Sequence, residues 1–391
     1  MLRQSGLQKN DWIHLWLAIA AGLLATAQQV MMVLLPVMAQ QFELSYQTLV
    51  SIQAGGSFLF LFSTPVWARI ATKTCIAVIL PIAMCGFALS FVLLIGLWWL
   101  HHRQPLSACL LTAGFVGVRL VYGVFASAIV PNIQNWSLRI NQCAPVAALA
   151  RINLGATLCR SITPLVAAAL LPFSPLAVAI LPLCLALMCL WRLPFTQADA
   201  GVALTKQRTC FSWRANSALI LALATSASLS FAQFSIAPVV QQRLRLSVVE
   251  SAEFLGYAVS LAAVLATFGQ IYFSRSVRVK AENVGLVALL LAIAGAVAMQ
   301  LSTQYFLSLM AICALSLGCN WLTLAYTAHL VNTGKGNGTS WVAIAHTLGY
   351  AVGALMLNVV HEYHYFFIAL ALLLAVVVLA ACKLLPNNRR A

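Results

Sequence analysis

The chain has 391 residues, of which 62% are hydrophobic and 7% are charged, and 22 Lys and Arg against 7 Asp and Glu give a formal net charge of +15. A soluble domain carries about 25% charged residues, so a water-facing surface cannot be built from this composition. The composition excludes a soluble globular enzyme, a disordered chain and a nucleic-acid-binding module.

Continuous apolar runs dominate the chain. A helix that crosses about 30 Å of hydrocarbon needs roughly 20 apolar residues, and such a run is twice the length of a barrel strand. We therefore predict an all-α membrane protein with 12 transmembrane helices. The first run is too long for the core of a signal peptide, and we expect it to remain as a helix. The predicted spans lie near residues 12–37, 47–67, 75–99, 106–131, 146–171, 174–194, 216–240, 251–273, 283–301, 304–328, 339–360 and 364–385.

The cations indicate how the chain is oriented. Seventeen lie on the same side as the N-terminus, whereas only Arg103, Arg243 and Arg245 lie on the opposite side. Cytoplasmic loops carry the excess of Lys and Arg, so we expect a multi-pass protein of the bacterial inner membrane with both termini in the cytoplasm. The net charge is then a topology signal, and we expect the lipid bilayer and no nucleic acid as a partner.

A polar stretch divides the chain into two halves. We predict an N-terminal six-helix bundle over residues 1–194, a cytoplasmic linker over 195–214 and a C-terminal six-helix bundle over 215–391. An internal repeat supports this division. At an offset of 202 residues, Pro36 falls on Pro238, Gln40 on Gln242, and the pair at 44–45 on the pair at 246–247.

Two arginines, Arg119 and Arg160, lie inside predicted spans. An arginine at the bilayer centre costs roughly 2.5 to 3.5 kcal/mol on insertion scales, so it is expected to face a cavity or a partner. One interpretation is that both bind an anionic substrate through the guanidinium fork. The alternative is that they bind backbone carbonyls or neighbouring side chains and hold helices together.

No acid lies at a predicted midplane, so a proton-coupled mechanism needs another titrating group. His346 is the first candidate, because the pKa of an unperturbed histidine is near 6.5. At an offset of 186, His346 falls on Arg160. The alternatives are a neutral histidine in a helix contact, or coupling through Asp11 or Glu253 near span ends.

Uncharged polar residues inside the spans complete the predicted substrate site. The same side chains also join helices in membranes by hydrogen bonds, which is the structural alternative. The eleven cysteines show no CxxC pair and no spacing for zinc, and no set of catalytic groups shares one depth, so we expect no metal, no cofactor and no enzyme. The candidates are Gln28, Gln29, Gln53, Gln233, Asn320, Trp321 and Tyr326.

Twelve spans, a six-plus-six repeat and a basic central loop resemble the major facilitator superfamily. In the fourth span, Arg119, Gly123, Ala126 and Ser127 resemble that family's RxxqGxgaa signature. The loop motif GxLaDrxGrk is degenerate after the second span, where Arg69 takes the place of the acid, and again after the eighth. In the family the arginine of the fourth span is shared whatever the cargo, so Arg160 is the better indicator of this protein's own substrate.

The resemblance implies a secondary transporter that works by alternating access. We expect a monomer that moves a small organic, anionic solute, such as a carboxylate siderophore, with protons as the candidate coupling ion. Thr163 and Pro164, followed by Ala167 and Ala168, are similar to the GPxxGG pattern of exporters, so export is favoured. The alternatives are an importer or proton-independent exchanger of organic anions and, from another class, a membrane-embedded enzyme or a non-transporting sensor.

Overall fold

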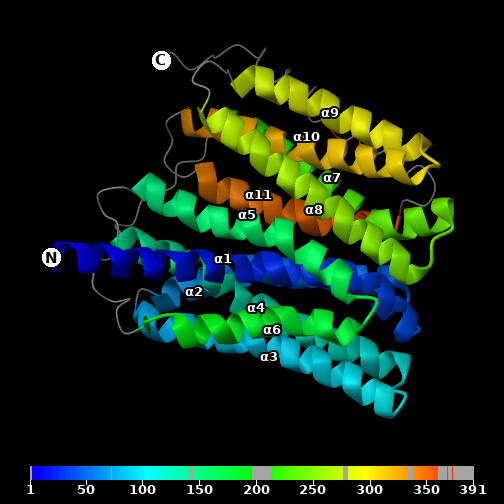
Figure 1. Cartoon of the computed structure of the whole chain (residues 1–391), viewed down its shortest axis with the longest axis horizontal. Helices are drawn as coiled ribbons and strands as arrows, with labels where there is room; N and C mark the ends of the chain where they lie inside the picture. Colours follow the sequence, from blue (N-terminus) through cyan, green and yellow to red (C-terminus); the bar gives the residue numbers. More distant parts are fainter. Residues whose placement is uncertain are drawn as a thin grey trace. The chain divides into compact units, whose positions relative to one another are not determined.

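The structure, a computed structural model, describes residues 2–71, 73–140, 145–195, 213–275, 281–332 and 338–359, together with Ile368 and Leu372. Within these ranges the chain forms eleven helices and no strand (Figure 1). They are α1 (Leu2–Gln41), α2 (Tyr46–Ala71), α3 (Ile76–Arg103), α4 (Ala108–Ile140), α5 (Pro145–Leu170), α6 (Pro175–Arg192), α7 (Trp213–Leu244), α8 (Val248–Arg275), α9 (Ala281–Leu301), α10 (Tyr305–Asn332) and α11 (Gly338–Met356).

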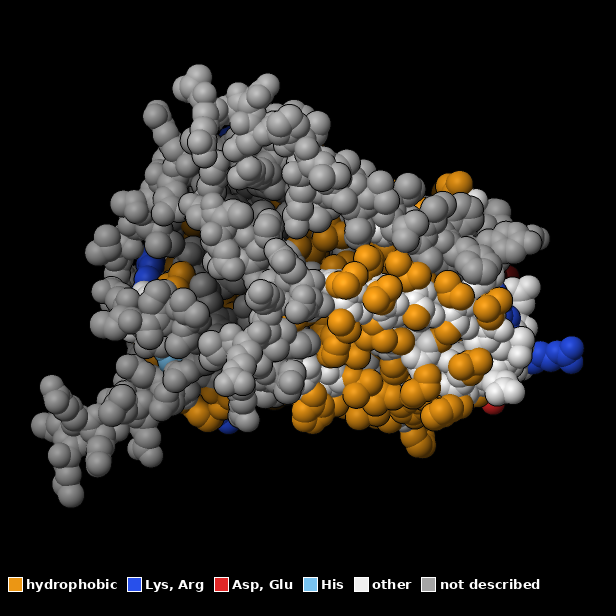
Figure 2. All heavy atoms as spheres, turned by 90° about the horizontal axis from the view of Figure 1, so that it is seen from above, with side chains coloured by type: hydrophobic (Ala, Val, Ile, Leu, Met, Phe, Trp, Pro, Cys, Tyr) orange, Lys and Arg blue, Asp and Glu red, His pale blue; other side chains and the backbone are white. Residues whose placement is uncertain are grey.

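Ten of these helices are long and apolar enough to cross a membrane, and α11 contributes a shorter apolar segment, Ile344–Met356. A helix satisfies its own backbone hydrogen bonds, which lipid cannot do, so these runs fold as helices. Hydrophobic side chains cover much of the described part of the face in Figure 2, and Lys and Arg side chains project at its end. The predicted all-α, multi-pass membrane fold is confirmed. The predicted span 364–385 and most of the predicted linker lie outside the described residues.

The described chain divides into two compact units. Unit 1 comprises residues 1–205 with 248–260, and unit 2 comprises residues 206–247 with 261–391. The division therefore places the first part of α8 with α1–α6, whereas the sequence predicts a single boundary at the linker. That part of α8 packs on α5, because a Cβ at Gly256 would lie 2.7 Å from the carbonyl oxygen of Pro164.

In unit 1, α1 and α5 form a close-packed pair. Gly155 leaves no room for a Cβ against the backbone of Ala18, and Gly22 leaves none against Cys159. One turn further along both helices, the hydroxyls of Thr26 and Thr163 lie 3.2 Å apart and share a hydrogen bond. Small residues at four-residue spacing let two helices approach this closely in a membrane.

Unit 2 repeats this arrangement with α7 and α11. Gly353 leaves no room for a Cβ against the backbone of Ala227. The Ser226 hydroxyl donates to the carbonyl oxygen of His346 and the Ser230 hydroxyl to that of Tyr350, both at 2.7 Å. Each unit thus holds its first and fifth helices together by small residues and hydroxyl hydrogen bonds.

The turn after the first helix of each half shows the internal repeat most directly. Glu43 and Arg245, which are 202 residues apart, have φ of 51° and 53° and are the described non-glycine residues with positive φ. After α1, the Leu44 N–H donates to the Ala39 carbonyl at 3.1 Å, which closes the helix in a Schellman motif with Glu43 in the left-handed conformation.

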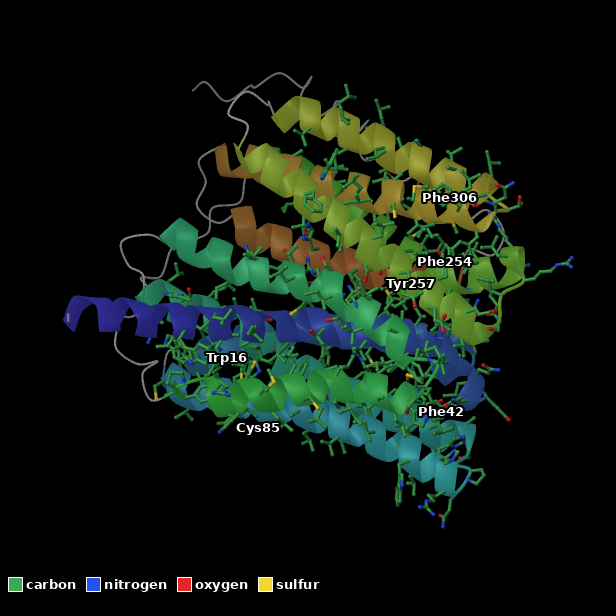
Figure 3. All side chains as sticks on the ribbon, in the orientation of Figure 1. Trp16, Phe42, Cys85, Phe254, Tyr257 and Phe306 are labelled. Atoms are coloured by element: carbon green, nitrogen blue, oxygen red, sulfur yellow. The ribbon has the colours of Figure 1, made fainter. Side chains whose placement is uncertain are left out.

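The last residues of these helices also correspond at the offset of 202. Gln41 at the end of α1 accepts a hydrogen bond from the Trp98 indole of α3 at 3.0 Å. The ring of Phe42, which Figure 3 labels, packs against the Trp98 ring. Arg243 near the end of α7 donates to the carbonyls of Met299 and Gln300 in α9, at 2.8 and 2.6 Å. In each half the first helix therefore binds the end of the third helix at the same repeat position.

Candidate functional site

Arg160 lies on an exposed polar face of α5. Asn153, Thr157 and Arg160 follow at steps of four and three residues, so they share one side of the helix. Asn153 is exposed and Thr157 is half-buried. The Thr157 hydroxyl donates to the Asn153 carbonyl at 3.0 Å.

A second exposed face of α5 is purely apolar. Leu154, Leu158, Ile162 and Leu165 are all exposed and recur at steps of four, four and three residues. Arg160 lies two residues after Leu158 and two before Ile162, which is roughly 200° around the helix at 3.6 residues per turn. The Arg160 side chain therefore leaves α5 opposite the apolar stripe suited to acyl chains.

Arg119 lies in a different environment, because it is buried between α4 and α2. Its guanidinium carbon stands 4.2 Å from the centre of the Tyr122 ring, a cation–π arrangement. A Cβ at Gly56 would lie 3.0 Å from Nε of Arg119, so the glycine gives the guanidinium its space. These contacts are those of a buried helix-packing arginine within unit 1.

The predicted glutamines divide by burial. Gln29 on α1 and Gln53 on α2 are buried, and the Oε1 atom of each lacks a hydrogen bond in the described structure. Gln28 on α1 and Gln233 on α7 are half-buried. Buried amide oxygens are normally satisfied, so Gln29 and Gln53 have acceptor capacity that the described protein groups do not use.

The two candidates Asn320 and Trp321 of α10 contact neighbouring residues of unit 2. The Asn320 side chain donates to the Ser316 carbonyl one turn earlier, at 2.8 Å, and Trp321 packs where a Cβ at Gly269 of α8 would otherwise lie. Both side chains are half-buried. Their placement is compatible with a pathway lining and with helix packing.

His346 and Tyr326, which the sequence analysis assigned to separate roles, are brought together. The Tyr326 hydroxyl forms a short hydrogen bond with Nε2 of His346, and the two rings meet edge to face with centroids 5.7 Å apart. Tyr326 also donates to the Thr323 hydroxyl at 3.1 Å, and Thr323 donates to the Cys319 carbonyl at 2.9 Å. The result is a continuous hydrogen-bonded chain from α10 to α11.

The sequence analysis did not identify several residues of these arrangements, among them Thr323, Gly56 and Asn153. The spacing of Thr323 and Tyr326, three residues apart on one helix, was a usable signal for their hydrogen bond. The spacing of Asn153 and Arg160 was a usable signal for a shared face. Gly56 had no such signal, because its role depends on a residue of another helix. Among the described residues, no group of three or more His, Cys, Asp or Glu side chains is arranged to hold a metal ion.

The comparisons with known proteins agree on the fold. Residues 17–354 match the family described as Major Facilitator Superfamily. A bacterial homologue of the human lysosomal transporter Spinster, inward-facing and unoccupied, is 15% identical with a TM-score of 0.68, over 95% of this chain and 94% of that one. Comparison with curated proteins finds no match.

Two further solved structures have the same fold. A bacterial homologue of the iron transporter ferroportin is 14% identical with a TM-score of 0.69, over 95% of this chain and 98% of that one. The peptide transporter POT is 11% identical with a TM-score of 0.71, over 97% of this chain and 94% of that one.

Proposed function

The chain belongs to the major facilitator superfamily, and from that premise we propose that it transports a small organic anion by alternating access, with Arg160 as the principal substrate ligand. It is a multi-pass membrane transporter, and the proposal concerns its cargo, coupling and direction. The observation that carries the proposal is the position of Arg160, exposed on α5 and roughly 200° from the apolar stripe.

An exposed guanidinium within a membrane span is costly against lipid and favourable in a wet pathway. Its planar fork suits a carboxylate or a phosphate, which it binds through two parallel hydrogen bonds. Asn153 and Thr157 on the same face add uncharged polar groups for the remainder of a solute. The chemistry therefore favours an organic anion, such as a carboxylate siderophore, over a neutral or cationic solute.

We assign the other candidates to supporting roles. Gln29 and Gln53 have amide oxygens to which no described protein group donates, and we assign these oxygens to donor groups of the solute. Gln28, Gln233, Asn320 and Trp321 line the pathway. Arg119 is the weaker ligand candidate, because Gly56 and Tyr122 already enclose its guanidinium.

Proton coupling is assigned to His346. The carboxylates whose side chains the structure describes lie in the turn after α1, at Glu43, or in the first two turns of α8, at Glu250 and Glu253. A histidine changes charge near neutral pH, and His346 is half-buried in a span. The proposed location is the bacterial inner membrane with both termini in the cytoplasm, and the proposed unit is the monomer.

Export is the favoured direction, because Thr163 and Pro164 with Ala167 and Ala168 keep part of an exporter pattern. The transporters with the same fold carry different cargoes, so the fold does not select one. The alternative is import or proton-independent exchange of organic anions, which vesicle flux measured in both directions separates from export. An enzyme or a sensor would show no flux at all.

The test uses purified protein in proteoliposomes and electrical or radiotracer detection of flux. The probes are small mono-, di- and tricarboxylates, each compared with its neutral amide. Wild type should move at least one carboxylate and none of the matching amides. Arg160→Ala should reduce that flux at least about tenfold, because a hydrogen bond to a charged group contributes 1.5 to 3 kcal/mol.

Arg103→Ala is the matched control, since Arg103 is an exposed arginine of the same unit at the end of α3. It should retain wild-type flux. If Arg160→Ala also retained it, with the protein monodisperse and correctly inserted, the ligand assignment would be wrong. Equal transport of carboxylates and amides would exclude the anionic class.

A further inference from the structure

We infer that Thr323 and Tyr326 are positioning residues that hold neutral His346 with its proton on Nε2, so that the ring gains and loses a proton at Nδ1. The inference rests on the hydrogen-bond chain between α10 and α11. Its consequence for transport rests on the proposed coupling role of His346, whereas the inference itself concerns which ring atom carries the proton.

Each group in this hydrogen-bond chain has a limited number of protons to donate. A threonine or tyrosine hydroxyl has one proton to donate and lone pairs that accept, whereas a backbone carbonyl only accepts. The Cys319 carbonyl is therefore the fixed end, and the Thr323 hydroxyl donates its only proton to it at 2.9 Å. Toward Tyr326, the Thr323 oxygen can then only accept.

The hydrogen bond between Tyr326 and Thr323 fixes the next donor in the same way. Tyr326 donates its only proton to Thr323 at 3.1 Å. The phenolic oxygen is left with lone pairs, so its short hydrogen bond to His346 needs a proton on Nε2 of the ring. All three hydrogen bonds then point the same way, from the imidazole to the carbonyl of Cys319. In a neutral histidine the hydrogen bond of one ring nitrogen determines the state of the other, so Nδ1 becomes the proton-accepting atom.

The helices around the ring are themselves held in place. The Ser226 hydroxyl of α7 donates to the His346 carbonyl at 2.7 Å, and the close approach of Gly349 and Gly353 keeps α11 against α7. The backbone of His346 is therefore anchored to α7 while its ring is anchored to α10. Such double anchoring limits rotation of the imidazole and preserves the order of the chain.

The titratable groups near this ring are few in the described residues. On α10 they are Tyr326 and the thiol of Cys319, and on α11 the next one is Tyr350, one turn beyond His346. The described part of α7, residues 219–244, has Arg243 as its one charged residue, at the end of the helix. These are the titratable and charged groups that the described side chains of α7, α10 and α11 provide around His346.

The test is nitrogen-15 NMR of histidine-labelled full-length protein in detergent micelles, at a pH where the ring is neutral. The signal of His346 is identified by its loss in His346→Gln. In wild type, the Nε2–H form should exceed the Nδ1–H form by at least about fivefold, the ratio that a net hydrogen bond of ordinary strength produces. A dominant Nδ1–H form in wild type would overturn the inference without any variant.

The decisive comparison is Thr323→Val against Thr323→Ser. Valine has nearly the shape of threonine but cannot accept, so the Tyr326 proton becomes available for donation to Nε2, and the Nδ1–H form should rise at least about fivefold relative to wild type. Serine retains the hydroxyl and should keep the wild-type ratio. Equal tautomer ratios in Thr323→Val and Thr323→Ser would refute the positioning role, whatever their stabilities.

The outcome is separable from that of the proposed function. If His346→Gln transports carboxylates with an unchanged dependence on the pH gradient, the coupling role fails, but the tautomer measurement remains valid. If coupling is lost in His346→Gln while Thr323→Val keeps the Nε2–H form, coupling stands and the positioning role is wrong. Tyr326→Phe provides a second route, because it should remove the Nε2–H preference without altering the Thr323 hydroxyl.

Discussion

The contact between α9 and α10 positions α10, and with it Thr323 and Tyr326. Gly318 of α10 lies at one of the close approaches between the two helices. A Cβ built at Gly318 would lie 2.5 Å from both the carbonyl oxygen of Ala288 and the amide nitrogen of Ala292. Ordinary contact begins at 3.4 Å. In Gly318→Ala the new Cβ would therefore be too close to these two atoms by 3.4 − 2.5 = 0.9 Å. Both obstructing atoms are backbone, so no rotamer change can relieve the overlap.

The expected cost follows from this overlap. Overpacking of this kind costs about 1 to 3 kcal/mol, and alanine recovers up to about 1 kcal/mol through its higher helix propensity. A net loss of about 1 to 2 kcal/mol lowers the Tm by about 2 to 8 °C at the usual 2 to 4 °C per kcal/mol. The assay is thermal unfolding of the detergent-purified protein, followed by tryptophan fluorescence.

Gly285→Ala is the matched control, because Gly285 lies on α9 and faces the same helix. A Cβ there would meet that of Ala325 at 3.4 Å, an ordinary contact. Gly285→Ala should leave the Tm unchanged or raise it slightly. If Gly318→Ala and Gly285→Ala unfold at the same temperature, the two helices separate without cost and the packing argument is refuted.

Three further predictions concern single contacts, each read by the same thermal assay. Gly56→Val should destabilise the protein by about 1 to 3 kcal/mol, because the new side chain enters the space of the Arg119 guanidinium. Gly55→Val should not, because a Cβ at Gly55 meets no atom within 4 Å. An equal loss of stability in both variants would contradict the packing of Arg119 against Gly56. Glu43→Gly should raise stability by about 0.5 to 1 kcal/mol by relieving a positive φ, whereas Glu43→Ala should not. Arg243→Ala should cost about 1 kcal/mol through its two lost hydrogen bonds to α9, and no loss relative to Arg245→Ala would show that they contribute nothing.

The membrane fold is largely predictable from the chain itself. Continuous apolar runs identify the spans, because each helix satisfies its own backbone and needs no partner to be recognised. The internal repeat with an offset of 202 residues is visible in the sequence at Pro36 and Pro238. In the structure the same offset relates the left-handed residues Glu43 and Arg245. The exposed polar face of Arg160 also follows from spacing along a single helix.

Contacts between helices could not be predicted in this way. In lipid, the residues that face the bilayer and those that face a neighbouring helix are both apolar, so the pattern along a span does not reveal how the helix is turned about its axis. The sequence suggested His346 for proton coupling and Tyr326 for substrate binding. In the structure the two side chains, from different helices, form a hydrogen bond with each other.

The amino-acid sequence alone determined that this protein is a multi-pass helical membrane protein with an internal repeat and two costly arginines in its spans, since hydrophobicity, charge and spacing are local properties. Only the tertiary structure decided that Gly56 gives the Arg119 guanidinium its space and that Thr323 and Tyr326 orient the His346 ring. These relations depend on how each helix is rotated about its axis and how far it lies from its neighbours. Side chains from distant parts of the chain determine both.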